Sequence, residues 1–442
     1  MKSEHSPLRR HSALLLFLVV SIINLIDRQM MGVVLEPVKK EFGVSDLAMG
    51  LLTGVAFALV YCVFALPLGR FADRTNRRNL ISWSCAAWSV MTLLCGFATN
   101  YWTLALGRIG VAVGEAGSAS ASLTIVADLY PPRQRARALA VFTLGAPIGT
   151  LIGLSVGAWI AYYHGWRAAF VWMAVPGLVA ALLVRLLAFE PARGGSEGAA
   201  LNDSGRPEPL RTVLRDAWRS SAFVKIVISG ALLGFSGYAF GIWSTAFLVR
   251  CHGLTLKDAG AIMGLAAGPG AIIGTLSSGW LTDRLAARDA RWQLGVPIVG
   301  ALLAFPLAVA FALYPSADPW KWGALVVPRV SVFMLGMSIF GMWWMAPSYA
   351  AITHIMRPDR RATTLSIYNF GVTAIGAGCG PLAVGALSDA LTPAFGENAL
   401  RWAMVGGAMG YLLAGLVLIG AVRPYARSIA AAVRGPALAA RA

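Results

Sequence analysis

The sequence has few charged residues. Only 13% of its 442 residues are Asp, Glu, Lys or Arg, whereas 57% are hydrophobic. Soluble domains contain about 25% charged residues, so this composition excludes an ordinary water-soluble protein. Apolar runs of about 20 residues, the length that a helix needs to cross a bilayer, recur along the chain. The sequence therefore predicts an all-α membrane protein with helical spans rather than barrel strands.

Cysteine is also scarce, and the residue patterns of metal and disulfide chemistry are missing. The five cysteines are scattered, and the sequence contains neither a CxxC pair nor an HExxH motif. A disulfide framework and a structural or catalytic metal cluster are therefore not indicated. We expect no cofactor, no metal and no enzymatic activity.

Acidic residues are outnumbered, since 37 Lys and Arg stand against 20 Asp and Glu, a net charge of +17. Such a chain could bind nucleic acid, but the placement of the charge argues against that. The N-terminus, every second connection and the C-terminal tail hold 25 of these basic residues, and the other connections hold only seven. This asymmetry follows the positive-inside rule, so both termini are predicted to be cytoplasmic.

Twelve transmembrane helices fit the apolar runs, six on each side of a polar segment rich in Gly, Pro and Ser. We predict an N-terminal six-helix half (1–189), a cytoplasmic linker (190–219), a C-terminal six-helix half (220–424) and a cytoplasmic tail (425–442). The predicted spans are 12–34, 46–70, 79–98, 102–129, 137–162, 168–189, 221–249, 258–282, 293–313, 323–355, 361–388 and 399–422.

The two halves repeat each other in sequence. "FGVSDLAMGLLTG" at 42–54 lies over "HGLTLKDAGAIMG" at 252–264 with an offset of 210, and three glycines coincide. At the same offset "GRFADRTNRR" (69–78) lies over "GWLTDRLAAR" (279–288). Two six-helix halves in parallel repeat are the architecture of a transporter that rocks around a central site.

A motif of the form G-x-x-x-D-R-x-x-R-R follows the second span and is half-repeated after the eighth. It resembles the signature between spans two and three of the major facilitator superfamily. The resemblance implies the fold of that superfamily and an inner gate built from these residues. The predicted inner-gate residues are Gly69, Asp73, Arg74, Arg77, Arg78, Asp128, Gly279, Asp283 and Arg284.

Each part of this motif has a physical reason. Gly69 allows two helices to approach closely. Asp73 is expected to accept hydrogen bonds from backbone N–H groups at the start of span eleven. The three arginines are expected to bridge to Asp128 at the end of span four, which would hold the two halves together on the inner side.

Two charged segments inside apolar runs carry a narrower resemblance. "INLIDRQMMG" in span one and "GRIGVAVGEAGSASAS" in span four resemble the N-x-x-D-R and R-x-x-x-G-x-G-E-A patterns of the spinster-like branch, with Ala112 in place of the first glycine. The resemblance implies proton-driven transport of lipid-like amphiphiles such as lysophospholipids or sphingoid phosphates.

The residues themselves also indicate a coupling site. Asn24, Asp27 and Arg28 share one helix face, and Arg108 and Glu115 lie two turns apart on another. A charge at the bilayer centre costs roughly 2.5–3.5 kcal/mol, so it needs a partner or a function. We predict that Asp27 and Glu115 couple to protons by competing for one arginine, since Arg stays charged while the acids titrate.

Aromatic residues concentrate in the second half, whose spans contain few acids. Such a half could form an apolar wall for an acyl chain while the charged half binds a head group. The predicted substrate-binding residues are Arg28, Arg108, Asn24, Tyr238, Trp243, Tyr349 and Asn369.

The sequence thus predicts a proton-coupled secondary transporter of an amphiphilic, lipid-like organic anion. A small organic-acid importer or a multidrug exporter of the same superfamily is an alternative, and a non-transporting membrane sensor or scaffold is an alternative of another class. Expected partners are the substrate, protons and the lipid bilayer, with no nucleic acid, and the protein is expected to be a monomer. Arg-rich, Lys-poor composition points to a bacterial inner membrane.

Overall fold

The computed structural model describes residues 7–191, 210–315, 319–322, 325–357 and 360–439. These residues form helices almost throughout, apart from one short hairpin. Eight helical stretches among them are long and apolar enough to cross a membrane, judged by length and composition. The predicted all-α membrane class is therefore confirmed.

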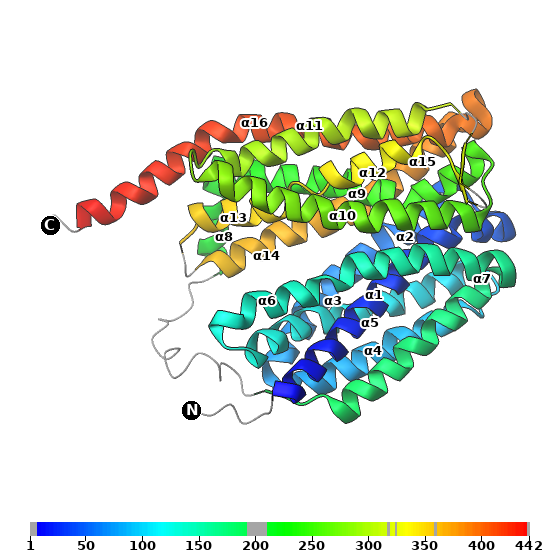
Figure 1. Cartoon of the computed structure of the whole chain (residues 1–442), viewed down its shortest axis with the longest axis horizontal. Helices are drawn as coiled ribbons and strands as arrows, with labels where there is room; N and C mark the ends of the chain where they lie inside the picture. Colours follow the sequence, from blue (N-terminus) through cyan, green and yellow to red (C-terminus); the bar gives the residue numbers. More distant parts are fainter. Residues whose placement is uncertain (1–6, 192–209, 316–318, 323–324, 358–359, 440–442) are drawn as a thin grey trace. The chain divides into compact units, whose positions relative to one another are not determined.

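The chain divides into two compact units, and each is described by itself. Unit 1 comprises Met1–Gly205 and Leu248–Gly268, and unit 2 comprises Arg206–Phe247 and Pro269–Ala442. In unit 1, α1 packs on α7, α4 packs on both α5 and α7, and α3 packs on α5 (Figure 1). The helices that lie wholly in unit 1 are α1 (Pro7–Phe42), α2 (Asp46–Thr53), α3 (Val55–Arg74), α4 (Arg77–Cys95), α5 (Tyr101–Leu129), α6 (Pro132–Thr143) and α7 (Gly145–Leu187).

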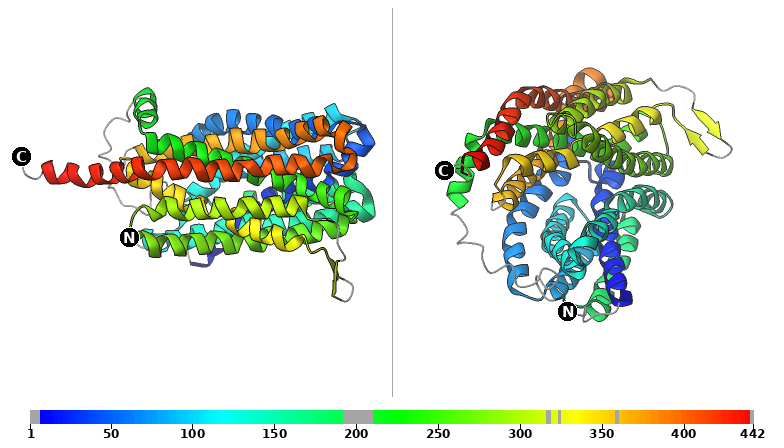
Figure 2. Two further views of the ribbon diagram at one scale, coloured as in Figure 1. Left: turned by 90° about the horizontal axis from the view of Figure 1, so that it is seen from above. Right: turned by 60° about the vertical axis from the view of Figure 1, so that its left-hand side comes forward.

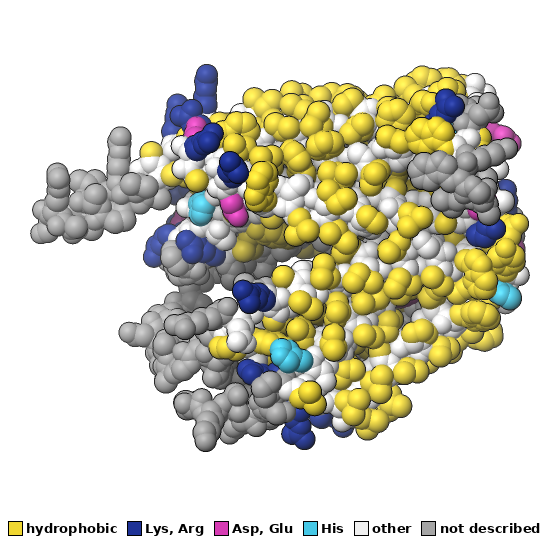
Figure 3. Space-filling view, viewed as in Figure 1, with side chains coloured by type: hydrophobic (Ala, Val, Ile, Leu, Met, Phe, Trp, Pro, Cys, Tyr) yellow, Lys and Arg dark blue, Asp and Glu magenta, His cyan; other side chains and the backbone are white. Residues whose placement is uncertain are grey.

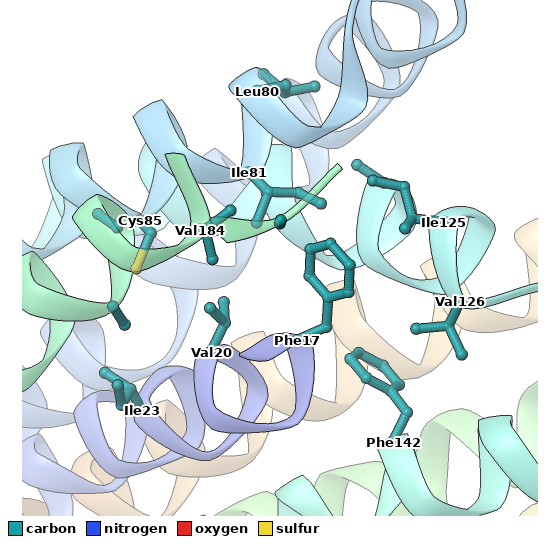
Figure 4. Close-up of a cluster of buried hydrophobic side chains, with 14 of the residues drawn as sticks. Phe17, Val20, Ile23, Leu80, Ile81, Cys85, Ile125, Val126, Phe142 and Val184 are labelled. Atoms are coloured by element: carbon teal, nitrogen blue, oxygen red, sulfur yellow. The ribbon is translucent and has the colours of Figure 1, made fainter. Parts of the chain in front are cut away.

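The core of unit 1 is apolar and joins six of its helices, α1 and α3 to α7. Phe17 of α1 points toward Ile81 of α4 and toward Ile125 and Val126 of α5, with Phe142 of α6 beside it (Figure 4). All five side chains are buried. This packing fixes α1 against α5, the two helices that contain the charged segments found in the sequence.

Close backbone contact brings α5 against α4. A Cβ atom on Gly114 would lie 2.7 Å from the backbone nitrogen of Trp88 and 2.8 Å from its Cβ. Only glycine allows this approach. The contact fixes where Arg108 and Glu115 of α5 lie along the helix axis relative to α4.

We therefore expect Gly114→Ala to destabilise the protein by about 1–3 kcal/mol through overpacking. The measurement is the midpoint of thermal unfolding in detergent. Gly241→Ala is the matched control, because a Cβ atom there meets nothing within 4 Å. Equal midpoints for the two variants would contradict the expected role of the close contact.

Unit 2 contains the remaining helices and the hairpin. In it, α16 packs on α11 and α15, and α12 packs on α11. Helices α9 and α10 begin or end in this unit and extend into unit 1. The elements are α8 (Leu210–Arg219), α9 (Ser221–His252), α10 (Leu256–Ala286), α11 (Trp292–Leu313), β1 (Trp320–Trp322), β2 (Leu325–Val327), α12 (Ser331–Phe340), α13 (Met345–Ile355), α14 (Arg361–Gly371), η3 (Val372–Ala377), α15 (Gly378–Phe395), η4 (Gly396–Asn398) and α16 (Ala399–Ala439).

The predicted tenth span, 323–355, differs in the structure. Within it, Leu325–Val327 form strand β2 of an antiparallel hairpin in which Trp320 pairs with Val327, and the helix begins only at Ser331. The aromatic and β-branched side chains of this stretch favour a strand, and Pro328 ends it. The rest of the range forms two helices, α12 and α13, separated by a turn that begins at Gly341.

The repeat seen in the sequence reappears in local geometry. Gly43, after α1, has φ 62°, and Gly253, after α9, has φ 64°. This left-handed conformation favours glycine and ends both helices in the same way. Two residues later, Ser45 and Thr255 each accept a hydrogen bond from the backbone N–H three residues on. The offset of 210 thus aligns residues with the same conformation.

The segment 248–268 is attached to unit 1 by charge and by close packing. Arg250 donates to Asp46 through both terminal nitrogens, each at 2.7 Å, and its Nε lies 2.5 Å from Glu36. Lys39 also pairs with Asp46, at 2.6 Å. Gly260 packs against Ala158 of α7 so closely that a Cβ atom on residue 260 would overlap the Cβ atom of Ala158. The loop after α9 is therefore an integral part of unit 1.

The exposed side chains on the flanks of the helices are hydrophobic. Trp102, Trp83 and Leu66 are more than two-thirds exposed. Figure 3 shows hydrophobic side chains over the sides of the helices, with Lys and Arg gathered near helix ends. Exposed apolar surface on this scale is characteristic of a protein that faces lipid, so the chain is an integral, multi-pass membrane protein.

Candidate proton and substrate site

Two acids and two arginines meet between α1 and α5 inside unit 1. Asp27 and Glu115 are 3% and 1% exposed, so neither faces the lipid surface. Glu115 forms a close ion pair with Arg28, whose Nη2 lies 2.6 Å and whose Nε lies 3.1 Å from the same carboxylate oxygen. The Arg28 side chain remains 28% exposed. The Glu115 carboxylate is therefore buried, whereas the Arg28 side chain is partly accessible.

The second pair is looser. Asp27 and Arg108 approach to 3.7 Å between Oδ1 and Nη1, which is beyond hydrogen-bond distance. Thr92 of α4 donates a hydrogen bond of 2.8 Å to the other oxygen of Asp27. Both charged side chains are 4% exposed. A buried ion pair without good hydrogen bonds stabilises the fold little, so its presence points to a function.

The expected competition of both acids for a single arginine is not the arrangement in the structure. Each acid faces its own arginine on the other helix, because Asp27 and Arg28 are adjacent on α1 and point in directions about 100° apart. Asn24, one turn before on α1, is half-buried. The result is two crossed ion pairs, one tight and one loose.

Two aromatic residues of α3 complete the site, and neither was predicted from the sequence. The Arg28 guanidinium carbon lies 5.4 Å from the ring centre of Phe57 and 5.2 Å from that of Tyr61. The Arg108 guanidinium carbon lies 5.3 Å from the same Phe57 ring. Both guanidinium groups thus have a cation–π partner in addition to a carboxylate. Span two contains other aromatic residues, such as Phe64, so the sequence alone could not single out this pair.

Several polar atoms of the cluster have no hydrogen-bond partner among the described residues. They are Asp27 Oδ1, Glu115 Oε1, and Nε and Nη1 of Arg108. Unpaired buried polar atoms are costly, and functional sites are where proteins retain them. The cluster can therefore accept a proton on either acid and can donate hydrogen bonds to an anion from Arg108.

The predicted binding residues of unit 2 have different surroundings. Tyr349 of α13 donates a hydrogen bond of 2.5 Å to Asn369 of α14, which is exposed. Tyr238 of α9 is half-buried. The ring of Trp243 is fully buried in this structure, and its indole N–H donates to the carbonyl of Pro381 at 2.9 Å. It packs the core of unit 2.

The first inner-gate motif forms an ion cluster within unit 1. Arg77 pairs with Asp128 at 2.6 Å, as predicted, and with Glu190 at 2.7 Å, which was not predicted. The backbone N–H of Arg78 donates a hydrogen bond of 2.9 Å to the Glu190 carboxylate. Arg74 is exposed at the end of α3. These bonds join α4, α5 and the first residue of the predicted linker, whereas the motif was expected to connect the two halves.

Among the described side chains, the other motif residues lie outside that cluster. Gly69 is half-buried on α3, and the side chain of Asp73 lies outside the described part of the chain. In the second copy, Gly279, Asp283 and Arg284 lie near the end of α10, where both charged residues are exposed. The Arg284 guanidinium stacks over Trp280, one turn before, at 5.6 Å.

Comparison with known proteins identifies the class. Residues 17–381 match the Major Facilitator Superfamily. The chain therefore belongs to the Major Facilitator Superfamily of membrane transporters, and it is not an enzyme.

Similarity to individual proteins narrows the position of the chain within this superfamily. It is 34% identical to an MFS-type efflux pump of Mycolicibacterium smegmatis, covering 95% of this chain and 92% of that protein. It is 28% identical to the sphingosine-1-phosphate transporter SPNS2 of Danio rerio, covering 89% and 78%. A crystal structure of a bacterial homolog of the human lysosomal transporter Spinster, inward-facing and unoccupied, matches with a TM-score of 0.81 at 27% identity, covering 96% and 99%. The predicted resemblance to the spinster-like branch is confirmed.

Proposed function

We propose that this protein is a proton-coupled secondary transporter of an amphiphilic organic anion of the lysophospholipid or sphingoid-phosphate type. It works by alternating access, as a monomer, in a bacterial inner membrane. In this proposal the chain crosses the membrane twelve times with both termini in the cytoplasm, and the sequence halves 1–189 and 220–424 are the moving bodies, joined by the linker 190–219.

The observation that carries the proposal is the pair of crossed ion pairs in unit 1. A proton on Glu115 removes the charge that holds Arg28, whose guanidinium is already partly accessible. The freed arginine keeps its contacts with Phe57 and Tyr61 and can bind an anionic head group. Deprotonation restores the pair and expels the anion. Asp27 and Arg108 form a second, looser switch of the same kind.

Other residues have supporting roles in the proposal. Asn24, Tyr238 and the hydrogen-bonded pair of Tyr349 and Asn369 are proposed to contact the rest of the substrate. The inner-gate residues are proposed to control access from the cytoplasm. They are Gly69, Asp73, Arg74, Arg77, Arg78, Asp128, Gly279, Asp283 and Arg284.

The test is transport by the purified protein in liposomes, with lysophospholipids and sphingoid phosphates offered with and without a pH gradient. We expect accumulation only with the gradient, and competition by amphiphilic anions but not by small organic acids. Accumulation that is independent of the gradient would contradict proton coupling, and transport of small acids alone would favour the importer alternative.

A second candidate is an exporter of structurally diverse amphiphiles, favoured by the name of the mycobacterial relative, an efflux pump. The two candidates differ in charge selectivity. An exporter of this kind should move cationic dyes and anionic lipids at comparable rates, whereas the primary proposal requires an anion that binds Arg28 or Arg108.

Phe57 provides a separate prediction about coupling. The Phe57 ring lies against both guanidinium groups. It therefore stabilises the positive charge of each arginine most when the partner acid is protonated and no longer provides a negative charge. In Phe57→Leu the protonated state loses about 1 kcal/mol, so the pH midpoint of transport should shift down by about half to one unit. Phe64→Leu, on the exposed side of α3, is the matched control and should keep the original midpoint. If the pH midpoint of transport is unchanged in Phe57→Leu, the ring has no part in proton coupling.

A further inference from the structure

Helix α8, Leu210–Arg219, has two contrasting faces. Val213 and Ala217, one turn apart, are buried at 5% and 2% exposure within unit 2. Arg211, Arg215 and Arg219 are spaced at i, i+4 and i+8 and are all exposed, so they form a stripe along the opposite side. Beside this stripe Trp218 is 55% exposed. We name this surface, Arg211, Arg215, Trp218 and Arg219, the basic face of α8.

The single acidic residue of α8, Asp216, pairs with another residue of unit 2 and does not neutralise the basic face. Asp216 accepts a hydrogen bond of 2.9 Å from Arg360, which precedes α14. This bond lowers the pKa of the Asp216 carboxyl, so the acid stays ionised and bound to Arg360. Arg215 reaches Asp216 only at 3.7 Å. The helix is therefore attached to unit 2 through its buried face and Asp216, and its orientation is fixed with the arginines outward.

The position of α8 in the chain places this face at the membrane boundary. One residue, Ser220, separates α8 from α9, which is one of the eight stretches able to cross a membrane. Figure 2 shows α8, in green, at an angle to the long helices beside the start of α9. Trp and Arg together are typical of the lipid headgroup layer.

We propose that the basic face of α8 binds the headgroups of anionic phospholipids in the adjacent leaflet. Amphipathic helices with basic residues and an exposed Trp bind such surfaces through charge and through the aromatic ring. Lipid binding there anchors the chain that enters α9. This site is separate from the proton and substrate site and does not depend on the transported molecule.

The test compares lipid binding by the full-length protein and by the double variant Arg211→Gln/Arg215→Gln. Native mass spectrometry in mixed micelles gives the affinity for phosphatidylglycerol against phosphatidylcholine. Each arginine near an anionic surface contributes roughly 5-fold, so we expect the variant to lose roughly 25-fold in phosphatidylglycerol affinity and nothing in phosphatidylcholine affinity. In the wild type, phosphatidylglycerol binding should weaken as salt rises.

The matched control is Arg288→Gln/Arg291→Gln, which removes the same charge from two exposed arginines between α10 and α11. It should keep wild-type phosphatidylglycerol affinity. Equal losses in both double variants would overturn the proposal, because net charge alone would then explain binding. Wild-type affinity in the α8 variant would also overturn it, as would stronger competition by double-stranded DNA than by phosphatidylglycerol vesicles. If the α8 variant does not fold, the salt series on the wild type and the substitution Trp218→Ala decide the outcome.

Discussion

Glu115→Gln should abolish uphill transport while leaving downhill exchange of substrate intact. The amide keeps the size of the side chain but cannot release a proton, so the Arg28 switch no longer responds to pH. One proton moving across 100 mV supplies about 2.3 kcal/mol, which corresponds to about 50-fold accumulation. We expect the accumulation ratio in proteoliposomes to fall from that range to unity.

The control for this variant is Asp289→Asn, the same change on an exposed acid of the α10–α11 connection. It should accumulate substrate like the wild type. Counterflow, in which labelled substrate exchanges against unlabelled substrate without a gradient, distinguishes loss of coupling from loss of folding. Gradient-driven accumulation at the wild-type level in Glu115→Gln would refute the assignment of Glu115.

Arg28→Gln should weaken substrate binding more than any other single change in the charge cluster. Its guanidinium is the accessible end of the tight pair, so it is the group best placed to meet an anion. Removing one partner of a hydrogen-bonded charge pair costs about 2 kcal/mol at the lower end of measured values, or roughly 30-fold in Kd. Binding of a lysophospholipid to the purified protein, measured by calorimetry, checks this.

Arg167→Gln is the matched control for that experiment. Arg167 also forms an ion pair of 2.6 Å, with Glu41, but both side chains are about two-fifths exposed and lie apart from the cluster. Exposed pairs contribute little, so the control should keep wild-type affinity. If Arg28→Gln binds the anion as tightly as the control does, the head group is not recognised by Arg28.

The charged residues of the site could be predicted from the sequence because they contrast with their apolar surroundings. Asp27, Arg28, Arg108 and Glu115 interrupt runs in which charge is costly. Helical spacing shows which residues share a face of one helix. It does not show how two helices are rotated against each other, so the pairing of each acid with its own arginine required the structure.

Other residues do not differ from their sequence neighbours in this way, so the sequence alone did not show where they lie in the fold. Phe57 and Tyr61 are aromatic residues in an apolar span, and nothing in the sequence distinguishes them from lipid-facing neighbours such as Phe64. Trp243 was selected on the same weak ground and packs the core. Glu190 lies 113 residues from Arg77, and only the fold brings them together.

The Arg250 cluster has a consequence for expressing the protein in pieces. Unit 1 is not one continuous stretch of chain, since it includes Leu248–Gly268. A fragment that stops in the linker would contain the nearly buried carboxylates of Glu36 and Asp46 without the guanidinium that binds both. A protein split at the linker should therefore work only when both pieces are co-expressed, and a first piece made alone should be a substrate for membrane quality-control proteases.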